Sequence, residues 1–240
     1  QSLADEVLTM SQRGYTAECV ARAAGIIREY PLEMIFQLML GLPGDNPDRA
    51  RYTAAQTIRL KPDGVRIYPA VIMKGTTLEK WYRAGLYQPW SLEEAVTIGT
   101  EWLLAFNAYG IKVIRLGLQA ADNLTNEADL VAGPYHPAYG ELVQSRLLLA
   151  QLRSLINKFF IETGTEDGLL SIYCHPRDLS KVAGQKRSNL RILSETYSNA
   201  KIVLETDPAL QREELRVAFG QKSSSLSRQD FLEEYRISSK

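Results

Sequence analysis

The sequence predicts an α/β protein, with parallel strands alternating with helices up to about residue 155 and a small α+β module after it. Three nearly continuous apolar runs, at residues 34–40, 65–71 and 111–118, are typical of parallel strands buried on both faces. Segments with helical periodicity separate these runs, and strand–helix–strand units of this spacing form parallel sheets with right-handed crossovers. The elements beyond residue 155 are shorter and mixed, which indicates a second, smaller unit.

Capping signals mark where the helices of the first region begin and end. Asn46-Pro47-Asp48 combines an N-cap, a first-turn proline and a first-turn acid. Ser91 and Glu94 form a capping box, and Gly110 follows the last turn of the helix that they open. Thr16 is the predicted N-cap of another helix. The predicted helices cover residues 3–10, 17–30, 47–60, 92–109 and 141–155, and long loops are expected at 72–90 and 119–140.

The second region is predicted to hold three strands and two helices. The helices flank the turn Gly184-Gln185-Lys186-Arg187. The predicted domains are 1–155, 156–220 and a charged tail, 221–240, that we expect to be frayed. The predicted strands of this region are 169–174, 202–205 and 215–219, and its helices are 178–183 and 188–197.

Composition narrows the class of protein. The chain carries 28 basic and 28 acidic residues, so no global charge attracts nucleic acid or a membrane. The longest apolar run, residues 34–42, is too short to span a bilayer, and no secretory signal opens the chain, so we predict a cytoplasmic protein. Cys19 and Cys174 form neither a disulfide framework nor a metal knuckle, and we predict that this chain alone holds no metal.

Polar residues in or just after the apolar strands are the first candidate site, because ligands of such folds bind beyond the carboxyl ends of the strands. Gln37, followed by the turn glycine Gly41, could hydrogen-bond a ribose or be a satisfied core glutamine. An arginine in an apolar strand needs a carboxylate, a phosphate or a ligand unless it extends to solvent. Two such arginines favour an anionic ligand. The predicted substrate side comprises Arg66, Tyr68, Lys74, Arg115 and His136.

His136 lies in the second long loop, between Pro134 and Pro137. Its imidazole could act as a general acid or base, or it could cap a turn. No nucleophile set, Walker-type loop or dinucleotide fingerprint occurs in the sequence.

The turn at Gly184, in the second region, is another candidate site. The order of elements around this turn resembles a KH-type nucleic-acid module, in which a Gly-x-x-Gly loop clamps the nucleic-acid backbone. That order is a strand, a helix, a basic turn that begins with glycine, a helix and a strand. Arg187 stands where that loop has its second glycine. The alternative is an ordinary solvated helix face. The predicted nucleic-acid-binding residues are Lys181, Lys186, Arg187 and Arg191.

Several motifs between Gln1 and Arg115 together resemble radical S-adenosylmethionine (SAM) enzymes, in particular the branch of the elongator catalytic subunit. Gln1-Ser2 resembles the end of a family strand, and Arg13-Gly14-Tyr15-Thr16 resembles the family's Arg-Gly-His-Thr, with Tyr15 as a departure. The remaining matches are Leu42-Pro43, Ile67-Tyr68-Pro69, Gly75-Thr76, Leu78, Trp81, Gly85 and Tyr87.

This resemblance implies the second half of an incomplete (β/α)6 barrel. The intact enzyme would use SAM and a four-iron four-sulfur cluster, and this chain alone would hold neither. Gln1 and Gln37 would contact the SAM ribose, Arg13 its carboxylate, and Gly41 would lie in the same cofactor site. The strand at 34–40 would then take its missing neighbour from an upstream part of the same barrel or from another copy.

The function that the resemblance implies is that of the C-terminal portion of a radical SAM oxidoreductase, inactive alone, with tRNA as a candidate substrate. Two alternatives remain: a non-enzymatic RNA-binding or assembly protein, and an enzyme similar to the oxygen-independent coproporphyrinogen oxidases.

Overall fold

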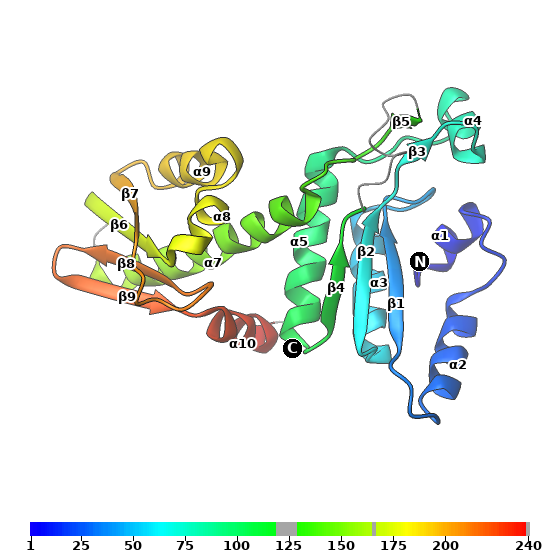
Figure 1. Cartoon of the computed structure of the whole chain (residues 1–240), viewed down its shortest axis with the longest axis horizontal. Helices are drawn as coiled ribbons and strands as arrows, with labels where there is room; N and C mark the ends of the chain where they lie inside the picture. The colour runs from blue at the N-terminus through cyan, green and yellow to red at the C-terminus, as the bar shows by residue number, and fades with distance from the viewer. Residues whose placement is uncertain (119–128, 165–166, 239–240) are drawn as a thin grey trace. The chain divides into compact units, whose positions relative to one another are not determined.

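The computed structural model describes residues 1–118, 129–164 and 167–238 (Figure 1). These residues form two compact units, Gln1–Gly140 and Glu141–Lys240, and each is described by itself. Gln119, which follows the last predicted strand of the first unit, lies outside the described residues.

Three helices of the first unit begin at the predicted caps. The Thr16 hydroxyl accepts from the Cys19 amide, and the Asn46 side chain accepts from the Arg49 amide. Ser91 and Glu94 form the predicted capping box. Its elements are α1 (Asp5–Met10), α2 (Ala17–Ile27), β1 (Ile35–Leu40), α3 (Pro47–Leu60), β2 (Gly64–Pro69), β3 (Ile72–Met73), α4 (Thr77–Arg83), α5 (Leu92–Ala108), β4 (Lys112–Leu116) and β5 (Leu130–Ala132).

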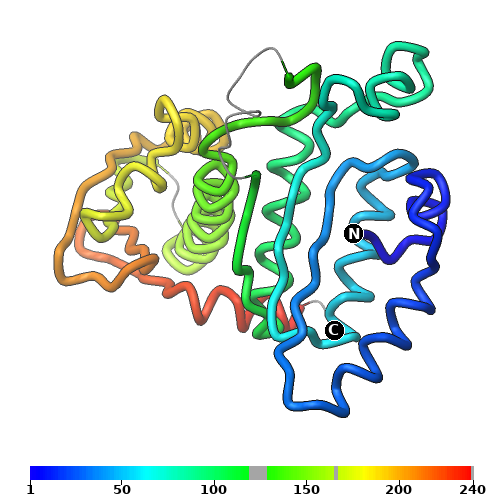
Figure 2. Tube along the Cα trace, turned by 45° about the vertical axis from the view of Figure 1, so that its right-hand side comes forward, coloured from blue at the N-terminus to red at the C-terminus, as the bar shows by residue number. Residues whose placement is uncertain are grey.

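The main sheet of the first unit is parallel, as predicted, with the strand order β1-β2-β4. Helices α3 and α5 lie on one side of these three strands (Figures 1 and 2). The core on that side joins strand residues such as Leu38 and Ile67 to Trp102 and Phe106 of α5. The described residues form an open sheet with β1 and β4 as its edge strands.

The predicted loop at 72–90 has structure of its own. Thr76 caps the short helix α4 by accepting from the Glu79 amide, and β3 pairs with β5 in an antiparallel ribbon. Short elements of this kind are common in long loops of compact domains.

The second unit is built on a mixed four-stranded sheet with the order β7-β6-β8-β9. Strands β6 and β7 are parallel, whereas β8 and β9 are antiparallel to their neighbours. Its elements are α7 (Tyr139–Thr163), β6 (Gly168–Cys174), the 3₁₀ turn η1 (Pro176–Asp178), α8 (Leu179–Ala183), the 3₁₀ turn η2 (Gln185–Arg187), α9 (Ser188–Thr196), β7 (Ala200–Thr206), β8 (Leu215–Phe219), β9 (Lys222–Leu226) and α10 (Arg228–Ser238).

The structure differs from the prediction at both ends of this unit. The units divide at Gly140 rather than at residue 155, because α7 runs on to Thr163 with Ile156, Phe159 and Phe160 buried in the second unit. The predicted frayed tail instead contains β9 and α10.

Two local features explain why the tail is ordered. Gly220, at φ +60°, allows a tight turn that pairs Phe219 with Lys222. Leu226 and Phe231 are buried, so the tail contributes apolar side chains to the core despite its serine-rich sequence.

Among the described residues, no helix combines the length and the apolar character needed to cross a bilayer.

Candidate functional site

The face of the β1-β2-β4 sheet opposite α3 and α5 exposes a row of polar side chains. Gln37 of β1 pairs in register with Arg66 of β2, and Arg66 pairs with Arg115 of β4. All three residues are exposed, while their strand neighbours Leu38 and Ile67 are buried on the helix side. Because side chains on adjacent strands lie about 5 Å apart, the three predicted residues form one continuous polar row. We call Gln37, Arg66 and Arg115 the sheet row.

Arg115 reaches this face because β4 carries a β-bulge. Val65 pairs with Val113, but Arg66 pairs with Arg115, so Ile114 is the extra residue. Regular pairing would place Arg115 opposite Ile67, on the buried helix face. Gly64 makes room for the bulge, since a Cβ there would lie 2.8 Å from Ile114 Cδ1.

Gln1 and Arg13 lie at the carboxyl end of β1. The Gln1 carbonyl accepts from the Met39 amide at 2.8 Å, and Met39 packs against Ala4 and Val7. The Arg13 guanidinium lies near the backbone nitrogen of Gln1. Arg13 Nε is buried without a hydrogen-bond partner among the described residues. A buried, unpaired guanidinium N–H is suited to a carboxylate ligand.

Gly41 has a structural role in the turn after β1. It adopts φ +74°, and a Cβ there would lie 3.0 Å from Trp90 Cγ. Its carbonyl accepts from the Tyr87 hydroxyl, and its amide donates to Asp45 Oδ2 at 2.9 Å. The turn and the Trp90 ring are sufficient to explain why residue 41 is a glycine. Contact between Gly41 and a cofactor therefore stays a prediction.

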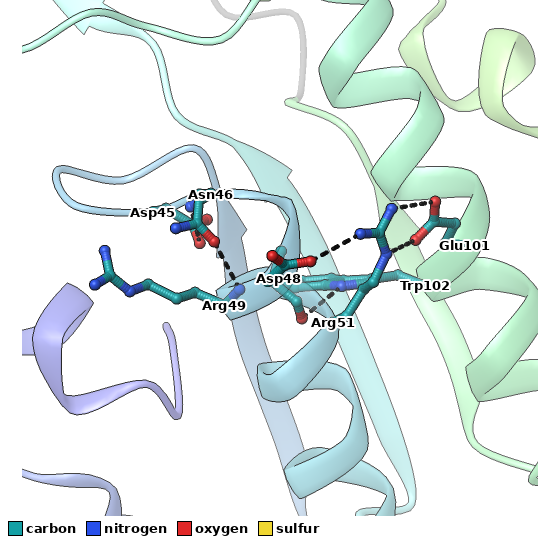
Figure 3. Close-up of polar contacts among 8 residues, drawn as sticks. Asp45, Asn46, Asp48, Arg49, Arg51, Glu101 and Trp102 are labelled. Carbon is teal, nitrogen blue, oxygen red and sulfur yellow. Dashed lines mark hydrogen bonds and ion pairs between the residues drawn. The ribbon is translucent and has the colours of Figure 1, made fainter.

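Asp45 is the residue of this turn that the sequence analysis missed. Its carboxylate also accepts from the Asn46 amide at 3.0 Å, and the positive charge of Arg49 acts on it. Figure 3 shows Asp45 in the turn that precedes α3. Burial is the largest effect on this group and raises the pKa of Asp45 to about 6, although both hydrogen bonds and Arg49 lower it. A carboxylate directly after a Gly-Leu-Pro-Gly turn is the sequence signal that could have identified it.

Asp45→Asn is expected to remove part of the pH dependence of stability. A carboxyl group whose pKa is raised from 3.8 to about 6 on folding stabilises the protein most below about pH 4. That contribution, up to about 3 kcal/mol, is lost as the pH rises through about 6. Urea unfolding between pH 4 and 7.5 should thus show a smaller loss of stability in Asp45→Asn than in the wild type. The matched control is Asp48→Asn, whose side chain is exposed, and an equal change in both variants would contradict the expectation.

The remaining predicted residues of this unit lie around the sheet row or beyond it. Tyr68 alternates with Ile67 and is half-buried on the same face as Arg66. Lys74 is exposed between β3 and α4, and its amide donates to the Asp129 carbonyl. His136 Nδ1 accepts from the Ala138 amide at 3.1 Å, the geometry of the turn-capping alternative. A catalytic role for His136 stays a prediction.

No group of three or more His, Cys, Asp or Glu side chains suited to a metal ion occurs within residues 1–118, 129–164 and 167–238. Cys19 is half-buried on α2, and Cys174 is buried in β6. These residues do not fit an iron–sulfur cluster.

The predicted nucleic-acid-binding residues of the second unit surround the turn η2. Lys186, Arg187 and Arg191 are exposed, and Lys181 is half-buried in the last turn of α8. The structure brings these four cations to one turn and the two helices that flank it.

Residues 62–148 match the family model of the radical SAM C-terminal domain. Over these residues the chain is similar to a radical SAM C-terminal domain. The match confirms the resemblance seen in the sequence motifs, and the domain includes β2, the bulged strand β4 and two members of the sheet row, Arg66 and Arg115.

Curated relatives of this radical SAM domain include two tRNA uridine(34) acetyltransferases. The chain is 34% identical over 93 residues to the protein of Dehalococcoides mccartyi, which covers 38% of this chain and 20% of the relative. It is 31% identical over 101 residues to the protein of Methanocaldococcus jannaschii, and this match covers 41% of this chain and 19% of the relative. The human Elongator complex protein 3 is 25% identical over 101 residues, covering 41% and 18%. The matched stretch thus spans about a fifth of each of these relatives.

A solved structure supports the fold of the region. The archaeal Methanocaldococcus infernus Elp3 with an N-terminal deletion superposes with a TM-score of 0.53 at 23% identity, over 68% of this chain and 35% of that chain. At this identity the similarity shows the fold alone.

Proposed function

We propose that this chain supplies the C-terminal part of the catalytic barrel of a radical SAM enzyme, and that its sheet row lines the cavity for cofactor and substrate. The observation that carries the proposal is the row itself. Gln37, Arg66 and Arg115 are in register on the face that α3 and α5 leave exposed. Two neighbouring guanidinium groups favour an anionic ligand, because each offers several fixed N–H donors.

The residues at the carboxyl end of β1 fit SAM. The unpaired Arg13 Nε is suited to the carboxylate of the amino-acid moiety. Gln1 and Gln37 would hydrogen-bond the ribose, as the family resemblance implies. When bound, SAM supplies the radical chemistry that removes hydrogen from a substrate. The residues of this chain would bind and orient it, and the described side chains do not fit an iron–sulfur cluster.

The proposed substrate class is tRNA. The names of the matched relatives specify uridine 34 of tRNA, and the arginines of the sheet row suit a phosphate-bearing substrate. We also propose that the chain alone is catalytically inactive and requires a cluster-binding part of the barrel.

Binding of S-adenosylhomocysteine, a redox-inert analogue of SAM, tests the cofactor part of this proposal. Saturation-transfer NMR on the whole chain should show transfer to the ribose and adenine protons of the ligand. Arg13→Ala should weaken binding about tenfold, since a hydrogen bond to a charged group contributes about 1.5–3 kcal/mol. Gln37→Ala should reduce transfer to the ribose protons selectively.

The control variant is Gln88→Ala, which changes an exposed glutamine in the loop before α5. Its ligand spectrum should match that of the wild type. Absence of binding at millimolar ligand, or equal binding by Arg13→Ala and the wild type, would overturn the proposed cofactor site.

A further inference from the structure

The turn between α8 and α9 carries a concentration of unpaired positive charge. Five cationic residues occur between residues 176 and 194, and none of their side chains forms an ion pair with the residues that the structure describes. Four of them are exposed and Lys181 is half-buried. They are Arg177, Lys181, Lys186, Arg187 and Arg191.

The one acid in this segment does not neutralise them. Asp178 is buried at 1% exposure, and its carboxylate lies 2.6 Å from Arg212 Nη2 and accepts from the Glu213 amide. Both oxygens of Asp178 are therefore engaged with the segment before β8. The cations of the turn keep their full charge toward solvent, where a polyanion would replace the counterions that they otherwise attract.

The backbone of the turn is held in an unfavourable conformation. Lys186 and Arg187 are consecutive non-glycine residues in the left-handed region, at φ 51° and 59°. This conformation is costly for a residue that carries a side chain, and it persists only where its surroundings enforce it. Gly184 contributes to that enforcement, because a Cβ there would lie 2.6 Å from Ser188 Oγ and 2.8 Å from the Asn189 nitrogen.

The buried side chain of Asn189 anchors the turn through hydrogen bonds to α7 and α8. This side chain is 3% exposed, and its amide group lies at 3.0 Å from the Ser145 carbonyl and 3.2 Å from the Val182 carbonyl. The buried Asn189 side chain thus holds two exposed cations in a costly backbone conformation. This indicates that the positions of their side chains are important for function at the expense of local stability.

We propose that the cations around this turn bind the phosphate backbone of single-stranded RNA. This inference rests on the proposed function for the choice of RNA, whereas the charge and geometry point to phosphodiesters. A duplex is recognised across two successive minor grooves, a span too long for one short turn. Residues 176–196 contain no Phe, Tyr, Trp or His side chain on which a base could stack. The contacts would therefore position the strand without reading its sequence.

The test is a salt series of binding to a fluorescein-labelled twelve-nucleotide oligouridylate, with the whole chain. Lys186→Ala/Arg187→Ala should bind at least tenfold more weakly than the wild type near 0.1 M salt. The plot of the logarithm of the association constant against the logarithm of salt concentration has a negative slope. In this variant the slope should be less steep by about 1.4, since each single-strand phosphate contact contributes about 0.7. Oligoadenylate should behave in the same way, and a duplex of the same length should bind more weakly.

The matched control is Lys201→Ala/Lys222→Ala, which removes two exposed lysines from β7 and β9 of the same unit. It should keep the wild-type affinity to within about twofold. Equal weakening of both double variants would mean that net charge alone drives binding and would overturn the site. Preferential binding of the duplex, or binding to phosphatidylserine vesicles and not to RNA, would also overturn it.

A second variant separates binding from folding. Lys186→Gly/Arg187→Gly should relieve the left-handed strain and raise the melting temperature of the second unit by about 5 °C, while RNA affinity falls as in the alanine variant. Unchanged RNA affinity in this more stable protein would contradict the proposal. S-adenosylhomocysteine binding should be unaffected in all three double variants, so a failure of the cofactor site and a failure of the RNA site give different results.

Discussion

Replacing Trp102 with alanine is expected to lower the free energy of unfolding of the first unit by about 3–5 kcal/mol, the range for large aromatic residues in cores. Trp102 is 1% exposed and packs edge-on against Phe106, with ring centroids 5.9 Å apart. Its indole nitrogen also donates to the Ala50 carbonyl at 3.0 Å, a link from α5 to α3 seen in Figure 3. The substitution would leave a large cavity between the helices and the sheet and would remove the donor from that carbonyl.

Urea unfolding followed by circular dichroism of the whole chain would measure this loss. Trp102→Phe should cost less, because it keeps most of the ring volume and loses only the hydrogen bond and part of the packing. The surface control is Tyr52→Ala on α3, whose side chain is exposed and which should change stability by less than about 0.5 kcal/mol. A loss below 1 kcal/mol for Trp102→Ala would contradict the assignment of this residue to the core.

Asn189→Ala is expected to have the largest effect in the second unit, about 2–4 kcal/mol. The side chain is buried, and its amide N–H groups face the Ser145 and Val182 carbonyls of α7 and α8. Without it the Lys181 and Val182 carbonyls at the end of α8 lose this donor in a dry environment, and each unsatisfied buried group costs about 1–3 kcal/mol. Asn189→Asp should cost at least as much, because a carboxylate would face carbonyl oxygens.

The measurement is the unfolding transition of the second unit, together with its affinity for oligouridylate. Since Asn189 anchors the turn that carries Lys186 and Arg187, both stability and RNA affinity should fall. Asn199→Ala, in the exposed turn before β7, is the control and should change neither. A stable Asn189→Ala protein with wild-type RNA affinity would show that the turn does not depend on this anchor.

Local sequence signals were sufficient to predict most of the helices and strands. The caps Thr16, Asn46 and Ser91 each place an oxygen on an amide of the first helical turn, as predicted, because capping depends on residues only two or three positions away. The parallel sheet followed from the continuous apolar runs of its strands.

Elements that depend on distant partners were missed. Strand β9 has a polar serine-rich sequence and is a strand because it pairs with β8, and α10 is ordered through the buried Phe231. The sequence places Asp45 directly after the Gly-Leu-Pro-Gly turn, but the partial burial of its carboxylate depends on how the turn after β1 folds back toward Gly41 and Tyr87.

The sequence by itself determined the order of the elements, the parallel pairing of β1, β2 and β4, and the presence of one glutamine and two arginines within them. Only the tertiary structure decided that these three side chains share a face. A strand alternates its side chains at every residue, so regular pairing of β4 would bury Arg115 against the helices. The extra residue Ile114, accommodated above Gly64, shifts the register by one and turns Arg115 to the exposed face beside Arg66.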